Sequence, residues 1–320
     1  MNALVTGAAG FIGSHLAERL LAEGATVVGL DCFTDHYARE LKEANVAALR
    51  ARRGFRFVET AVQAADWPAL LAGTTHVFHL AARAGVHGSW GRDFGAYTAC
   101  NVEATQVLLE ACRSAALERI VYASSSSVYG AAGELPLRED ARLQPVSPYG
   151  VTKLAAEHLC HLYWAGYGLP AVSLRYFTVY GPRQRPDMAF HRFLMAVLAG
   201  TPVALYGDGG QTRDFTHVDD AVAATVSAGL RGEPGSVYNI GGGARVSLND
   251  VLALVARCTG REPVVRREAA RKGDMRDTWA DTSRARRELR FAPSVTLEQG
   301  IETEYEWLSG AMGRDGSAAG

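Results

Sequence analysis

The sequence predicts an α/β fold with a doubly wound parallel sheet of the Rossmann type and a smaller C-terminal α/β lobe for the substrate. Short apolar runs rich in Val and Leu lack polar alternation, which is typical of parallel strands covered on both faces. These runs alternate with helical patterns, as in doubly wound folds. Hydrophobic residues make up 48% of the 320 residues, which is enough for a substantial core.

The elements follow one another in a regular order as far as about residue 176. Strands are expected at residues 2–7, 25–31, 55–59, 76–82, 119–125 and 171–176, with helices such as 11–24 and 101–115 between them. Residues 182–190 read as a loop, and residues 218–230 and 247–260 read as amphipathic helices. We expect a nucleotide-binding domain at 1–175 (with part of 210–240 returning to it), a lobe at 176–312 and a disordered tail at 313–320.

Composition excludes several classes of protein. The net charge of −1 argues against a nucleic-acid binder with a broad basic face. The five cysteines form no CxxC pair, which indicates reduced thiols in a cytoplasmic protein. The chain opens directly into a strand, and its apolar runs are too short to span a bilayer, so neither a signal peptide nor a membrane association is expected.

A glycine-rich turn joins the first predicted strand to the first helix. The sequence TGAAGFIG places Gly7, Gly10 and Gly13 there, where backbone can approach a pyrophosphate beside a helix N-terminus. Asp31 ends the second strand, so its carboxylate can accept hydrogen bonds from both ribose hydroxyls and would repel a ribose phosphate. This pattern predicts NAD as the cofactor, in preference to NADP.

A tyrosine and a lysine lie one helical turn apart in SPYGVTK. Ser147 suits the N-cap and Pro148 the first helical position, so Tyr149 and Lys153 share one face. A free tyrosine has a pKa near ~10, and lowering it by roughly three units takes on the order of 4 kcal/mol. The Lys153 ammonium, the helix N-terminus and a nicotinamide cation could together make Tyr149 a base near neutral pH.

Many motifs in one order resemble the extended short-chain dehydrogenase/reductase family, and within it the nucleotide-sugar epimerases and dehydratases. They include TGAAGFIG, HLAARAGV, YASSSSVYG, SPYGVTK, RYFTVYGPRQRPDMAF, GDGGQTRDFTHVDD and GDMRDTWAD, and the likeness runs from the first strand to about Trp307. UDP-glucose and UDP-glucuronate 4-epimerases are the most similar members.

The resemblance implies a catalytic set of Ser125, Tyr149 and Lys153, in which Ser125 relays a sugar proton to Tyr149 and Lys153 holds the nicotinamide ribose. The implied cofactor-binding residues are Gly7, Gly10, Phe11, Ile12, Gly13, Asp31, Leu80, Ala81, Ala82, Asn101, Tyr149 and Lys153. The implied reaction is oxidation at C4 of a UDP-hexose, rotation of the transient 4-keto sugar, and return of the hydride to its other face. NAD is regenerated in each cycle and should stay bound.

Ser126 and Ser127 discriminate between reactions within the family. The 4,6-dehydratases carry Asp and Glu at these positions to eliminate water, and the UDP-glucuronate decarboxylases typically carry a Glu at the second. Serines are too weak as acids or bases for that work. Epimerisation without elimination therefore remains, and both serines are expected to contact substrate.

The resemblance also implies that Arg213 and Arg276 bind the substrate diphosphate, for which guanidinium geometry is suited. Thr178 stands where UDP-glucuronate epimerases have Thr, and Arg185 matches an arginine near the sugar C5 group. A solvent-facing or diphosphate-binding Arg185 is nearly as well supported. Thr178 and Arg185 slightly favour UDP-glucuronate over UDP-glucose, whereas Ser125 and His87 favour UDP-glucose.

Some positions depart from the family pattern. Ala61 replaces a usual Asp and Cys32 a common Asn, which weakens contacts to adenosine, and His87 replaces an Arg of the glucuronate enzymes. His158 and His161 share a helical face, but no further ligand lies near them in sequence, so no metal site is expected.

Helices 101–115 and 148–167 carry apolar residues on more than one side, and the resemblance implies that they form a four-helix bundle in a homodimer. Two alternatives remain open for the function. One is another nucleotide-sugar epimerase or reductase of the same family, and the other is a non-catalytic NAD-binding sensor.

Overall fold

Seven parallel strands form the central sheet of the protein, whose computed structural model describes residues 1–131 and 134–317. The strand order is β11-β6-β5-β4-β1-β2-β3, which is the doubly wound order extended by one strand at the β6 edge. The strands are β1 (Asn2–Thr6), β2 (Thr26–Asp31), β3 (Phe55–Glu59), β4 (His76–His79), β5 (Arg119–Ser125), β6 (Ala171–Tyr176) and β11 (Val237–Ile240). The predicted fold class is confirmed.

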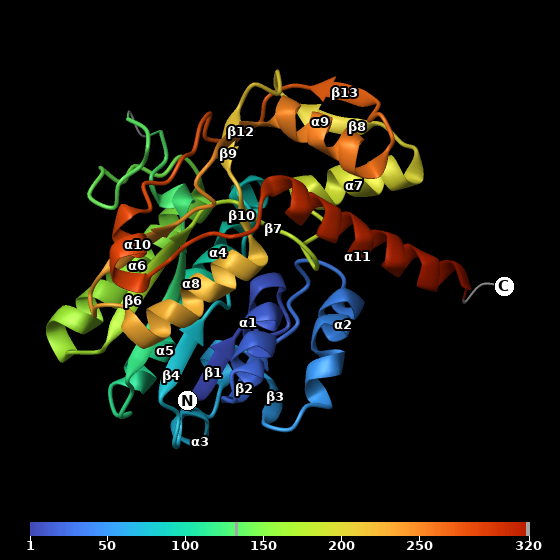
Figure 1. The fold of residues 1–320 in the computed structure, drawn as a ribbon. Helices are drawn as coiled ribbons and strands as arrows, with labels where there is room; N and C mark the ends of the chain where they lie inside the picture. Colours follow the sequence, from blue (N-terminus) through green and yellow to red (C-terminus); the bar gives the residue numbers. More distant parts are fainter. Residues whose placement is uncertain (132–133, 318–320) are drawn as a thin grey trace.

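Helices cover both faces of this sheet, which explains why its strands are apolar on both sides (Figure 1). One apolar layer contains residues of α1 (Phe11–Ala22), α2 (Arg39–Arg50), α8 (Val218–Arg231) and α10 (Ser283–Leu289). The other contains residues of α3 (Trp67–Leu71), α5 (Ala104–Cys112) and α6 (Pro148–Tyr167). The carboxyl ends of the strands are left open between these layers.

Helix α6 starts as its sequence predicts. The Ser147 hydroxyl accepts a hydrogen bond from Gly150 N at 3.1 Å, and Pro148 occupies the first turn. The helix predicted at 101–115 is instead part of a longer helical run of α4 (Phe94–Thr98), a π-helical turn (Ala99–Glu103) and α5. The π turn is a local widening that sequence periodicity does not reveal.

Part of the C-terminal half forms a smaller lobe above the carboxyl ends of the sheet strands (Figure 1). Its core joins α7 (Ala189–Ala199), α9 (Leu248–Thr259) and α11 (Leu297–Ser317). Three two-stranded sheets complete the second half, formed by β7 (Val179–Tyr180) with β10 (Thr216–His217), β9 (Thr212–Asp214) with β12 (Arg245–Ser247), and β8 (Val203–Tyr206) with β13 (Val265–Glu268).

The chain crosses between the two parts more than once. After entering the lobe it returns to cover the sheet with α8 and to extend it with β11, which pairs with β6. Helix α11 continues to Ser317, although the tail was expected to begin at residue 313. Residues 318–320 of that expected tail lie outside the described residues. Within the described ranges, no helix has both the length and the hydropathy needed to cross a bilayer.

Candidate functional site

A cavity of about 400 Å³ lies at the carboxyl ends of the central strands, where doubly wound folds bind ligands. It brings together residues predicted from motifs far apart in the sequence. The predicted residues that line it are Gly7, Gly10, Phe11, Ile12, Gly13, Asp31, Leu80, Ala81, Ala82, Ser125, Ser126, Ser127, Tyr149, Lys153, Thr178 and Arg185.

The glycine turn at one end of the cavity has no room for side chains at two of its positions. Gly7 has φ +74°, and a Cβ built on it would lie 2.8 Å from Ala81 N. A Cβ on Gly13 would lie 2.1 Å from Gly7 O, so α1 can pack this closely against the turn only if residue 13 is glycine. Gly10 caps α1 without a side-chain hydrogen bond to the helix. This bare backbone at a helix N-terminus fits the pyrophosphate of a dinucleotide.

Asp31 closes the same end of the cavity. Its Oδ2 accepts a hydrogen bond from Ala9 N at 3.1 Å and its Oδ1 accepts one from Phe33 N at 2.9 Å. Burial raises the pKa of Asp31, and the two backbone N–H groups partly offset this rise. The carboxylate is thus held facing the cavity, with lone pairs left on each oxygen for ribose hydroxyls. The residues present fit the adenosine half of NAD.

Asn101 does not line the cavity, unlike the other predicted cofactor residues. It is 1% exposed, and its amide is used within the protein. Its Oδ1 accepts from Arg83 N at 2.8 Å, and its Nδ2 donates to Arg83 O and to Thr152 Oγ1. Asn101 lies within the π turn and ties the loop after β4 to α6, whereas the resemblance implied direct contact with the cofactor.

Ser125 ends β5 and turns the chain along the cavity wall. Its hydroxyl accepts a hydrogen bond from Ser127 N at 3.1 Å and so caps the short 3₁₀ turn Ser126–Val128. The cap holds the three serines 125–127 together at the carboxyl edge of the sheet. Tyr149, at the start of α6, is close enough for the Ser125 hydroxyl to lower its pKa.

The surroundings of Tyr149 act on its pKa in opposite directions. Burial raises the pKa of Tyr149, and the Ser125 hydroxyl and the Arg185 guanidinium only partly counter this rise. Lys153 is not among the groups that shift it. The Lys153 ammonium, 3% exposed, lies 4.5 Å from the centre of the Tyr122 ring, and burial lowers its pKa to about 7. The chain alone thus places positive charge near the phenol through Arg185.

Arg185 reaches the cavity from the loop between β7 and α7. It makes a two-pronged ion pair with Asp187, at 2.9 Å (Nε–Oδ1) and 3.0 Å (Nη2–Oδ2). His36 and Tyr37 line the cavity nearby, and the Arg185 charge acts on the pKa of both. The sequence analysis missed His36 and Tyr37, because the loop after β2 carries no motif that marks them.

Arg213 and Arg276 do not line this cavity but lie beside each other in the second half of the chain. Arg213 Nη1 donates to Arg276 O at 3.1 Å, and the exposed Arg276 side chain pairs with Asp208 at 3.1 Å. The structure therefore separates the two predicted diphosphate ligands from the sixteen predicted residues that line the cavity.

The fold and the site together are those of a dinucleotide-dependent enzyme. The chain belongs to the NAD dependent epimerase/dehydratase family, whose model matches residues 3–241. It is 44% identical to the uncharacterized UDP-glucose epimerase YtcB of Bacillus subtilis over 97% of this chain and 98% of that protein. It is 37% identical to the UDP-glucuronate 4-epimerase of Thermodesulfobacterium geofontis, over 95% of each chain.

Solved structures agree with this assignment. The UDP-glucuronic acid 4-epimerase of Bacillus cereus, crystallised with UDP-glucuronic acid and NAD, superposes with a TM-score of 0.94 at 43% identity, over 97% of this chain and 100% of that one. MoeE5, crystallised with UDP-glucose and NAD, gives a TM-score of 0.87 at 43% identity, over 98% and 100% of the two chains.

Proposed function

We propose that this protein is an NAD-dependent UDP-sugar 4-epimerase, an isomerase that inverts C4 through a transient 4-keto sugar. The observation that carries the proposal is that one cavity is lined by the glycine turn, Asp31, Ser125, Tyr149 and Lys153. The 4-epimerases among its relatives support the same reading.

In this proposal the chain's own residues bind the cofactor and move one proton. Gly7, Gly13 and Asp31 hold NAD, which when bound supplies the acceptor and donor of hydride for C4. Tyr149, through Ser125, takes the proton from the sugar O4 and later returns it. Ser126 and Ser127 offer no carboxylate to the sugar, so water is not eliminated.

The raised pKa of Tyr149 constrains this mechanism. A phenol whose pKa is raised by burial loses its proton readily only when positive charge lies beside it. Arg185 supplies such a charge, and an oxidised nicotinamide bound in the cavity would add to it. Burial lowers the pKa of Lys153 to about 7, so Lys153 is not a fixed cation at neutral pH, and its amine can bind a ribose hydroxyl in either protonation state. We therefore assign Lys153 to cofactor binding first.

The C5 group of the sugar is proposed to meet Arg185 and Thr178, which slightly favours UDP-glucuronate over UDP-glucose. Arg185 already pairs with Asp187, so a substrate carboxylate must share or displace that partner. His87, where the glucuronate enzymes have an Arg, pairs with Asp274 at 3.1 Å and bridges the loop after β4 to the second half of the chain. Arg213 and Arg276 remain proposed ligands of the diphosphate, which would extend from the cavity toward them.

We further propose a homodimer, a cytoplasmic location and the two-part domain division described above. Residues 151, 155, 158 and 162 lie at helical spacing along α6, and Val151 and Leu162 are 49% and 59% exposed. Helix α5 packs beside α6, so a second copy could complete a four-helix bundle there. The return of α8 and β11 to the sheet supports counting them with the nucleotide-binding domain.

One experiment tests the function directly. The purified protein is incubated separately with UDP-glucuronate and UDP-glucose, without added NAD, and the products are separated by anion-exchange chromatography. We expect the 4-epimer of at least one substrate, with no net redox product. A reduced sugar would indicate a reductase of the same family, and the absence of both turnover and bound NAD would indicate a sensor.

A further inference from the structure

The loop that carries Arg185 adopts a backbone conformation that its residues do not favour on their own. We call residues 181–188, between β7 and α7, the arginine segment. Gly181 has φ +128°, and Arg183 has φ +66°, a left-handed conformation that costs a non-glycine residue about 1 kcal/mol. Contacts from outside the segment must therefore hold it in place.

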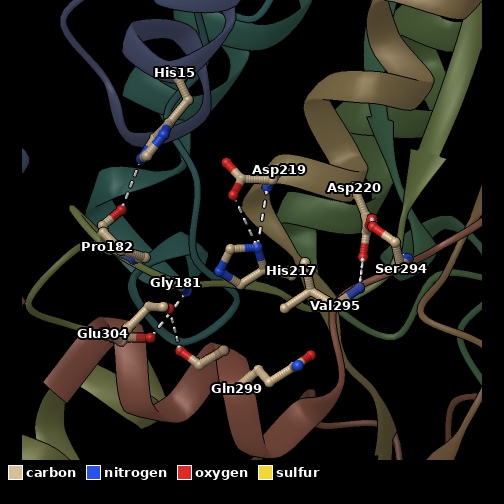
Figure 2. Close-up of polar contacts among 12 residues, drawn as sticks. His15, Gly181, Pro182, His217, Asp219, Asp220, Ser294, Val295, Gln299 and Glu304 are labelled. Atoms are coloured by element: carbon tan, nitrogen blue, oxygen red, sulfur yellow. Dashed lines mark hydrogen bonds and ion pairs between the residues drawn. The ribbon is translucent and has the colours of Figure 1, made fainter. Parts of the chain in front are cut away.

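Two helices far away in sequence supply such contacts (Figure 2). From α11, Glu304 Oε2 accepts a hydrogen bond from Gly181 N at 2.9 Å. From α1, His15 Nε2 lies 2.9 Å from Pro182 O, and Glu18 pairs with Arg183. Burial lowers the pKa of His15 to about 4, so its ring is neutral and must donate to Pro182 through Nε2–H.

Glu304 is the most unusual of these anchors. It is 0% exposed, and its Oε1 has no hydrogen-bond partner among the described residues. Burial raises its pKa to about 8, so it is a neutral acid at pH 7. Burying a carboxyl group is costly unless it is hydrogen-bonded, and among the described residues the Glu304 side chain makes one hydrogen bond, to the arginine segment.

Space around Gly181 is filled from the other side by His217. A Cβ on Gly181 would lie 2.9 Å from His217 Nε2, an atom that also lacks a partner among the described residues. Asp219, two residues after His217, donates its backbone N–H to His217 Nδ1 at 3.3 Å (Figure 2). The Asp220 carboxylate accepts hydrogen bonds from Ser294 N and Val295 N, just before α11. The start of α8, the start of α11 and the arginine segment therefore meet at one buried junction.

We propose that Glu304 is a positioning residue for the sugar end of the site, which holds Arg185 at the cavity wall through the backbone of the arginine segment. Glu304 lies outside residues 3–241, the part of the chain that the family model matches. The effect on substrate choice rests on the proposed function, because it requires Arg185 to meet the sugar C5 group.

Three variants test this inference. Glu304→Ala removes the acceptor for Gly181 N, Glu304→Gln keeps an oxygen at the same reach, and Glu306→Ala changes an exposed carboxylate on the same helix as a control. Glu304→Met, of similar length, replaces the Ala variant if that variant does not fold. Hydrogen exchange of a peptide covering residues 177–188 is measured by mass spectrometry, and kcat and KM are measured for both sugar nucleotides.

In Glu304→Ala we expect one amide of the 177–188 peptide to exchange about tenfold faster, because the Gly181 N–H loses a hydrogen bond of about 1.4 kcal/mol. KM for UDP-glucuronate should rise about tenfold with kcat changed less than about twofold, while KM for UDP-glucose changes little. Glu304→Gln and Glu306→Ala should behave as the wild type in every measurement.

Other results would overturn the proposal. Unchanged exchange in Glu304→Ala, equal KM changes for the two sugars, or a Gln variant as impaired as the Ala variant would each show that Glu304 does not position Arg185. If the wild-type protein turns over neither sugar nucleotide, the proposed function fails, and the exchange experiment still decides whether Glu304 anchors the segment.

Discussion

At the scale of single residues, burial decides which side chains of the site are charged. Lys153, the helix N-terminus and a nicotinamide cation were expected to lower the pKa of Tyr149 together. Both side chains line the cavity. Burial raises the pKa of Tyr149 and lowers the pKa of Lys153, and each shift favours the neutral form of the side chain. Arg185, which stays charged, is the chain's own source of positive charge beside the phenol.

The lowered pKa of Lys153 predicts a pH dependence of stability. Between about pH 7 and pH 10 the unfolded chain binds a proton at Lys153 that the folded chain does not. The free energy of unfolding should therefore rise with pH by about 1.4 kcal/mol per unit from this group. In Lys153→Met that contribution should be absent. Urea unfolding of both proteins at pH 7, 8 and 9 measures it, and parallel curves would contradict the assignment.

Removing the charge of Arg185 should lower activity more on one substrate than on the other. In Arg185→Met, kcat/KM for UDP-glucuronate should fall about 10- to 100-fold, because a charge-assisted pair contributes about 1.5–3 kcal/mol. UDP-glucose, which has no carboxylate, should lose less, because only the effect of the Arg185 charge on Tyr149 is removed. Steady-state kinetics on both substrates measure the ratio. An equal loss for the two would show that Arg185 does not meet the carboxylate at C5.

At the scale of elements, one buried ion pair fixes α6 to the sheet. Arg175 of β6 contacts Glu157 of α6 at 2.6 Å, with 3% and 5% of the two side chains exposed. Ser124 donates to the same carboxylate, and Arg175 also donates to Tyr129. The helix that carries Tyr149 and Lys153 is thereby held in register with the strand that carries Ser125.

Removing only one partner of this ion pair should destabilise the protein strongly. Arg175→Met leaves the Glu157 carboxylate buried without its cation, and we expect a loss of about 3–5 kcal/mol in the free energy of unfolding. The double variant Arg175→Met/Glu157→Met should recover much of that loss, since no charge is left unpaired. Denaturant unfolding measures both variants. A double variant less stable than the single one would argue against charge burial as the cause.

The sequence predicted these elements unevenly. The six strands from β1 to β6 and the start of α6 at Ser147 follow from local patterns, and the structure has them. The π turn at Ala99–Glu103 and the burial of Asn101 depend on packing between α5 and α6 and have no local signature. The same holds for the pKa of Tyr149, because burial is a property of the whole fold.

At the scale of the whole molecule, the second half of the chain completes the site that the first half begins. The arginine segment is held by α1 and α11, whose contacting residues His15 and Glu304 lie far from it in sequence. No periodicity or motif marks Glu304 as important. Contacts of this kind, more than a hundred residues apart, could be found only in the folded structure.

The proposed dimer makes a prediction at the same scale. Leu162→Glu places a charge on the exposed apolar face of α6 and should reduce the solution mass from that of a dimer to that of a monomer. Leu230→Glu is the matched control, because Leu230 is 54% exposed on α8, a helix outside the proposed bundle. Light scattering at micromolar concentration compares them. A wild-type monomer, or a dimer untouched by Leu162→Glu, would contradict the proposed bundle.

The most direct test of the account is the turnover of Tyr149→Phe, which removes one oxygen and keeps the ring. If Tyr149 takes the proton from the sugar O4, kcat for the preferred UDP-sugar should fall by at least about 100-fold, the usual contribution of a general base. The dissociation constant of that sugar nucleotide, measured by calorimetry, should change only a few-fold. A variant that epimerises at near the wild-type rate would contradict the account.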